Sequence, residues 1–100
     1  MLMSRATSAA ALLKALGHEK RLLILCHLAG GEMTVAELEE ALELRQAIVS
    51  QHLTRLRLEG LVVARRSGKA NCYRLTDART AELLDCVEAL FRDGAPSSTD

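Results

Sequence analysis

Two short helices joined by a tight turn are the feature that most constrains how this chain can fold. The first begins sharply, because Thr34 is followed three residues later by Glu37. This is a capping box, in which each side chain satisfies the free backbone N–H of the other residue. A turn over residues 43–45 leads into a second helix over residues 46–59, which Gly60 ends. The pattern predicts a helix-turn-helix.

The second of these helices has two unlike faces. At about 100° per residue, Val49, Leu53 and Leu56 fall within one arc and are expected in the core. The opposite arc holds small or polar residues, which are Gln46, Ala47, Ser50, Gln51, Thr54 and Arg55. A helix that reads base edges in the major groove needs small and hydrogen-bonding side chains near its N-terminal end. An ordinary amphipathic surface helix could share this pattern, so the flanking segments decide between the two interpretations.

The segment after Gly60 changes to a β-pattern. Residues 61–66 are expected to form a strand, residues 67–70 a turn, and residues 71–75 a returning strand. Three basic residues gather at the tip of this hairpin with no acidic residue close in sequence, namely Arg65, Arg66 and Lys69. We expect them to contact backbone phosphates, which position a protein on DNA without specifying sequence.

The charge distribution supports a nucleic-acid partner although the chain has no net charge. Residues 45–74 contain seven basic residues and one acidic residue. Phosphate contacts act locally, so a basic block inside a neutral chain is a meaningful signal. A solvated basic face is the alternative that charge alone leaves open. Aromatic residues are only 2% of the chain, which argues against the base stacking that single-strand binders use.

The remaining segments complete a mainly α-helical fold. Helices are expected over residues 4–16, 19–29 and, capped by Thr76 or Asp77, up to about residue 92. The helix over residues 19–29 is apolar on most sides, which is typical of a central helix. One hundred residues accommodate one core, so we expect one domain over residues 4–92 with about five helices and a β-hairpin. Residues 93–100 are small, polar and expected to fray.

The runs "LGHEKRLLILCHL" and "TVAELEEALELRQAIVSQHLTRLRLEGLVVARRSGKANCYRLT" resemble the ArsR/SmtB family of bacterial repressors. The resemblance implies a winged helix-turn-helix and a homodimer formed through the first and last helices. It also implies binding to an imperfect palindrome in double-stranded DNA and release by an inducer. Transferred by position, the DNA-reading residues are Gln46, Ala47, Ser50 and Gln51. Arg45 stands where the family usually has a helix-capping serine, and we expect it to contact phosphate instead.

The metal sites of this family are not matched. The segment "TVAELEEAL" lacks the Cys-x-Cys pair of the arsenic, cadmium and lead sensors, and "TDARTAELLDCVEALFRD" lacks the histidine of the zinc and nickel sensors. His52 lies at the edge of the buried arc, which favours a packing role over a ligand role. We therefore expect no metal and no cofactor, with a metal sensor of unrecognised site as the alternative.

Cys26 is the better sensing candidate. "RLLILCHL" is similar to the second helix of the family branch that responds to sulfide, persulfide or oxidants through a cysteine pair. The partner position in that branch aligns with Arg92, and the nearest cysteine, Cys86, lies six residues earlier. That is about 9 Å of helical rise, whereas a disulfide needs Cα atoms within roughly 7 Å. A Cys26–Cys86 link therefore needs a polysulfide bridge or another register, and packing as a small hydrophobe is the other interpretation of Cys26. Cys72 is expected to be an exposed or half-buried passenger.

Other classes of protein are disfavoured. The sequence has no nucleophile–base pair, phosphate loop or carboxylate dyad, so an enzyme is not expected. It has no signal peptide and no run of about 18 apolar residues, so a cytoplasmic location without a membrane partner is expected. A winged-helix module for protein contacts would carry an apolar or acidic recognition face, and this one is polar. The sequence thus predicts a dimeric DNA-binding repressor with a small thiol-reactive inducer.

Overall fold

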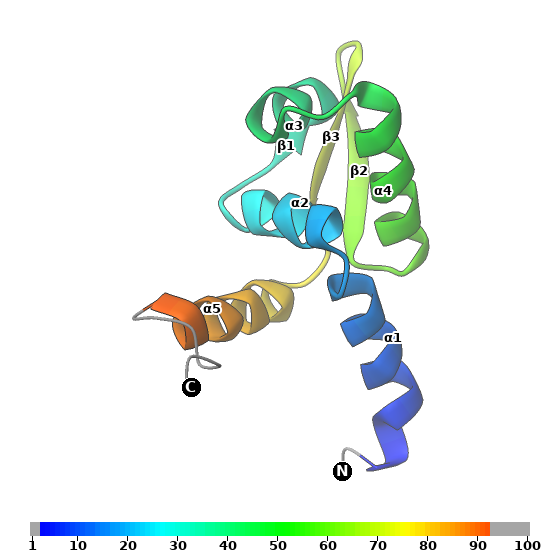
Figure 1. The fold of residues 1–100 in the computed structure, drawn as a ribbon. Helices are drawn as coiled ribbons and strands as arrows, with labels where there is room; N and C mark the ends of the chain where they lie inside the picture. Colours follow the sequence, from blue (N-terminus) through cyan, green and yellow to red (C-terminus); the bar gives the residue numbers. More distant parts are fainter. Residues whose placement is uncertain (1–2, 93–100) are drawn as a thin grey trace.

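The computed structural model describes residues 3–92 and confirms a mainly helical fold with a β-hairpin (Figure 1). The elements in chain order are η1 (Met3–Arg5), α1 (Ala6–Leu16), α2 (Glu19–Ala29), β1 (Met33–Thr34), α3 (Val35–Leu42), α4 (Gln46–Leu58), β2 (Val62–Ser67), β3 (Ala70–Leu75) and α5 (Ala78–Arg92). The first helix begins with a short 3₁₀ turn, and β1 was not predicted. The fraying expected of residues 93–100 concerns residues outside the described range.

Local hydrogen bonds explain why these helices begin where they do. The predicted capping box is confirmed: the Glu37 backbone N–H donates to Thr34 Oγ1 over 3.1 Å, and the Thr34 N–H donates to Glu37 Oε1 over 2.8 Å. Of the two candidates before α5, Asp77 is the cap, because the Arg79 N–H donates to Asp77 Oδ1 over 2.8 Å. The Arg79 guanidinium also lowers the pKa of Asp77 to about 2, so this carboxylate stays charged at neutral pH.

Gly60 ends α4 as predicted, one residue beyond the capping residue Glu59. Gly60 has a φ of 79°, a backbone conformation that side chains disfavour. Its N–H donates to the Arg57 carbonyl over 3.0 Å, and the N–H of Leu61 donates to the Leu56 carbonyl over 2.9 Å. These two bonds form a Schellman motif, which turns the chain directly from α4 into β2.

The hairpin is part of a three-stranded antiparallel sheet with the order β1-β3-β2. The pairing of β2 with β3 runs from Val62 opposite Leu75 to Ser67 opposite Ala70, which leaves Gly68 and Lys69 at the turn. On the other edge of β3, β1 contributes only two pairs. A strand of two residues is too short to show an alternating pattern, which is why the sequence did not predict it.

The core lies between the sheet and α2, α3 and α4. The three residues predicted for the buried arc of α4 are all fully buried, namely Val49, Leu53 and Leu56. Helix α2 contacts α1, α3, α4, α5 and β3, which confirms its central position. Its apolar circumference is not fully covered, however, because Leu23 and Cys26 are exposed.

The two ends of the molecule differ in structure (Figure 1). The tip of the hairpin and the N-terminal end of α4 lie at one end, whereas α1 and α5 extend from the other. Within residues 3–92, none of the helices has the length and apolar character to cross a bilayer. The fold therefore separates a polar, basic end from an end built from two outlying helices.

Candidate nucleic-acid interface

The exposed face of α4 is the centre of the candidate interface. Burial of Val49, Leu53 and Leu56 fixes the rotation of the helix, so its opposite side faces outward. That side carries the predicted residues: Ser50 is half-buried, and the exposed ones are Gln46, Ala47, Gln51, Thr54 and Arg55. The structure brings these six residues onto one polar surface, as the helical spacing predicted.

The N-terminus of α4 is open. Arg45 precedes the helix in extended backbone, and in the described structure its side chain makes no capping hydrogen bond. The first N–H groups of a helix and its dipole favour a negatively charged group. The position of Arg45 is compatible with the phosphate contact expected of it.

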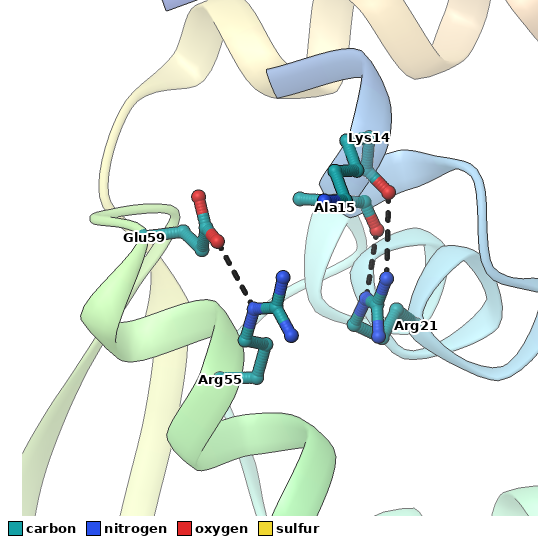
Figure 2. Close-up of polar contacts among 5 residues, drawn as sticks. All are labelled: Lys14, Ala15, Arg21, Arg55 and Glu59. Atoms are coloured by element: carbon teal, nitrogen blue, oxygen red, sulfur yellow. Dashed lines mark hydrogen bonds and ion pairs between the residues drawn. The ribbon is translucent and has the colours of Figure 1, made fainter. Parts of the chain in front are cut away.

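Arg55 is paired along its own helix (Figure 2). Its Nε donates to Glu59 Oε2 over 3.0 Å, one helical turn further on. A pair of this exposure contributes at most about 1 kcal/mol, so a phosphate could displace the carboxylate. Arg55 therefore keeps its basic character at the edge of the polar surface.

The hairpin places its three basic side chains differently from one another. Lys69 is exposed at the turn, and Arg66 Nε donates to the Gly68 carbonyl over 3.2 Å. Arg65 makes two hydrogen bonds of 2.7 Å each with the carboxylate of Glu32. The expectation that no acid lies near these cations is therefore wrong. Glu32 directly precedes β1, and the unpredicted pairing of β1 with β3 brings it to the hairpin.

A groove of about 350 Å³ connects the helix-turn-helix to the hairpin. Gln46 lines it from α4 and Lys69 from the hairpin turn, with Asn71 and Glu39 beside them. Sequence analysis missed Asn71 and Glu39, because neither belongs to a motif and only the fold brings them here. The groove shows that the predicted base-reading helix and the predicted phosphate-contacting hairpin share one surface.

His52 and His18 pack together on the inner side of α4. Their ring centroids lie 4.6 Å apart, and His18 Nδ1 accepts the backbone N–H of Lys20 over 3.2 Å as the cap of α2. Partial burial, followed by the nearby charges of His18, Arg21 and Lys20, lowers the pKa of His52. The packing role expected of His52 agrees with this contact. No group of three metal-ligating side chains is present within residues 3–92.

Arg21 holds the end of α1 against α2 (Figure 2). Its Nε donates to the Ala15 carbonyl over 2.9 Å, and its Nη2 donates to the Lys14 carbonyl over 3.3 Å. These carbonyls belong to the last turn of α1 and have no partner within their own helix. Arg21 thereby fixes how α1 leaves the rest of the domain, a role that the sequence did not reveal.

The three cysteines have different environments. Cys26 on α2 and Cys86 on α5 are exposed and lie on helices that pack together. Partial burial and, secondarily, the negative charge of Glu88 on α5 raise the pKa of the Cys26 thiol. Cys72 is buried, so the expectation of an exposed or half-buried residue is wrong. It lies on β3, the central strand, where neighbouring strands flank it on both sides.

The end of the molecule opposite the groove exposes large apolar side chains. Leu13 on α1 is 60% exposed, Leu90 and Phe91 on α5 are 61% and 55% exposed, and Leu23 on α2 is 42% exposed. Clustered apolar side chains on a protein surface often mark an interaction site. This end is therefore a candidate surface for a second copy of the chain.

Residues 18–63 match the family described as "Bacterial regulatory protein, arsR family". The chain is 46% identical over 87 residues to the biofilm growth-associated repressor of Agrobacterium fabrum, covering 87% of this chain and 74% of that protein. Its fold is similar to the transcriptional repressor BigR from Xylella fastidiosa, with a TM-score of 0.86, 41% identity, and coverage of 90% of this chain and 92% of that one. It is also similar to a homodimeric winged helix-turn-helix DNA-binding domain from Mycobacterium bovis, with a TM-score of 0.79, 33% identity, and coverage of 88% and 82%.

Proposed function

This chain belongs to the arsR family of bacterial regulatory proteins, and we propose that it acts as a homodimer on an imperfect palindrome in double-stranded DNA and is released by a thiol-reactive inducer. It is a winged helix-turn-helix transcriptional repressor, not an enzyme. The observation that carries the proposal is the groove in which Gln46 and Lys69 meet, because it joins a base-reading helix to a phosphate-contacting hairpin.

Two sets of residues would contact DNA. The base-reading set lies near the N-terminal end of α4 and consists of Gln46, Ala47, Ser50 and Gln51. The phosphate-contacting set surrounds it and consists of Arg45, Thr54, Arg55, Arg65, Arg66 and Lys69. Glutamine and serine can pair with base edges in the major groove, whereas cations bind any sequence equally.

The homodimer would form through α1 and α5. The apolar side chains exposed on these helices support this arrangement, as does the homodimeric relative from Mycobacterium bovis. A symmetric dimer places its two reading helices on half-sites about 34–36 Å apart. Because α4 lies at the other end of each subunit, the α1–α5 interface would set that separation.

Replacing Lys69 or Gln51 by alanine should affect DNA binding in different ways. Lys69→Ala removes a cation, so affinity should fall about equally on all sequences, and the salt slope should shrink by roughly one for each phosphate that is no longer neutralised. Gln51→Ala removes a base-reading group, so it should cost on the order of 1–3 kcal/mol on the operator and much less on random duplex. Fluorescence anisotropy titrations at several salt concentrations measure both effects.

The two variants serve as controls for each other. A parent protein whose affinity does not depend on salt would contradict the DNA-binding proposal. Equal losses on operator and random duplex for Gln51→Ala would show that α4 does not read bases.

The inducer would act on Cys26, with Cys86 as its partner. Their positions on adjoining helices, one of them in the proposed dimer interface, support this. With a peroxide, the two thiols would lose two electrons and two protons, an S–S bond would form, and the peroxide would leave as water. Because burial and Glu88 keep the pKa of Cys26 high, the thiol is mostly protonated at neutral pH and should react slowly. Moving α2 against α5 would change the spacing of the reading helices.

Cys26→Ser should bind operator DNA like the parent protein but remain bound after treatment with peroxide or polysulfide. The expected loss is the full inducer response, which for allosteric coupling is typically about 1–3 kcal/mol. Cys72→Ser is the matched control and should release DNA normally, because Cys72 is buried in the sheet. Release of the Cys26→Ser variant to the same extent as the parent would show that this thiol does not sense the inducer.

A further inference from the structure

The sheet has an inner and an outer face. Successive side chains of a strand point to opposite faces, and residues directly paired across strands share a face. Val62, Tyr73 and Leu75 belong to or pack against the apolar core, so they define the inner face. Cys72 lies on the outer face, paired with Thr34 of β1 on one side and with Arg65 of β2 on the other.

Cys72 is only 8% exposed although it is not part of the apolar core cluster. The pair formed by Arg65 and Glu32 accounts for this burial. Glu32 directly precedes β1 and Arg65 lies on β2, so their two hydrogen bonds must span the intervening strand β3. Cys72 is the residue of β3 that lies opposite Arg65, and the two groups interact electrostatically. The crossing side chains therefore cover Cys72.

We propose that Glu32 and Arg65 form a clasp across β3, and that DNA phosphate competes with Glu32 for Arg65. Glu32 would then set how strongly the hairpin contributes to DNA binding. This inference rests on the proposed function, because it requires the hairpin to approach phosphates. It assigns to Glu32, which no DNA-binding motif contains, a role in limiting affinity.

The geometry of the clasp makes such competition feasible. The side chains of Arg65 and Glu32 are 58% and 28% exposed, and an ion pair this open to water is weak. A phosphate offers the guanidinium the same two-pronged contact as a carboxylate. The hydrogen bond from Arg65, with smaller effects of the charges of Arg65 and Arg74, lowers the pKa of Glu32. Glu32 is therefore charged at neutral pH, and once released it would repel the phosphate that replaced it.

Glu32→Gln should bind DNA more tightly than the parent, because the neutral amide holds Arg65 less strongly and does not repel phosphate. We expect a threefold to tenfold gain at low salt on both operator and random-sequence duplex. The salt slope should become steeper by about one per subunit, since one more phosphate is neutralised. Glu32→Gln combined with Arg65→Ala should bind like Arg65→Ala alone, because the gain acts through Arg65.

A second measurement tests the clasp without DNA. With Cys26 and Cys86 replaced by serine, Cys72 is the remaining thiol of the chain. Its alkylation by N-ethylmaleimide should accelerate several-fold in both Glu32→Gln and Arg65→Ala, because each variant opens the cover. Only Glu32→Gln should also gain DNA affinity, which separates loss of the cover from release of the cation.

Glu40→Gln is the charge-matched control, because Glu40 is an exposed carboxylate on α3 near Glu32. An equal gain for Glu40→Gln would overturn the proposal by showing a general effect of net charge. An unchanged affinity of Glu32→Gln, or an unchanged alkylation rate of Cys72, would also overturn it. Failure of the proposed function looks different, because the parent protein itself would then bind no duplex.

Discussion

Replacing Leu13 and Leu90 together by glutamate is expected to convert the dimer into monomers and to lower affinity for the palindromic operator by about 10²- to 10⁴-fold. Leu13 on α1 and Leu90 on α5 are 60% and 61% exposed in the single chain, and a dimer interface would cover them. A buried, unpaired carboxylate is strongly disfavoured in such an interface. Once the subunits separate, the second half-site no longer benefits from the high effective concentration that the linkage provides.

Leu58→Glu is the matched control for this prediction. Leu58 is 82% exposed but lies at the C-terminal end of α4, away from α1 and α5. It should leave the sedimentation velocity of the protein unchanged, whereas the double variant should sediment as a monomer. A double variant that remains dimeric would show that another surface joins the subunits.

The parts of the fold that sequence analysis predicted are those controlled by contacts between near neighbours. The start of α3 depends on Thr34 and Glu37, and the end of α4 depends on the positive φ of Gly60. Both signals lie within a few residues of the boundary that they determine. The buried arc of α4 followed from helical periodicity for the same reason, because rotation about one helix axis is a local property.

The parts that were missed depend on residues far apart in the chain. Strand β1 is two residues long and exists because β3 offers it hydrogen bonds. Its pairing brings Glu32 to Arg65, which corrected the expectation of an unpaired basic tip, and helps to bury Cys72. Arg21 is similar, since its role appears only when the last carbonyls of α1 lie beside it.

The candidate interface shows the same division. Its composition was predictable, because small and polar residues recur on one face of a single helix. The pairing of its cations was not, because each arginine chooses among acceptors that the fold supplies. Arg55 finds Glu59 one turn along its own helix, whereas Arg65 finds Glu32 across a strand. Only the first of these pairs has a sequence signature.

Leu53→Ala is expected to lower the free energy of unfolding by roughly 2–5 kcal/mol, through the cavity left in a core that collapses only partly. Leu53 is fully buried and holds α4 against the rest of the domain. The loss would be a large part of the roughly 5–15 kcal/mol that stabilises a typical domain. Thr54→Ala, one residue further and exposed, should change stability by at most about 0.5 kcal/mol. Urea unfolding of both variants at one protein concentration gives the comparison, since dimerisation makes stability depend on concentration. A loss below about 1 kcal/mol for Leu53→Ala would mean that α4 is held mainly by other contacts.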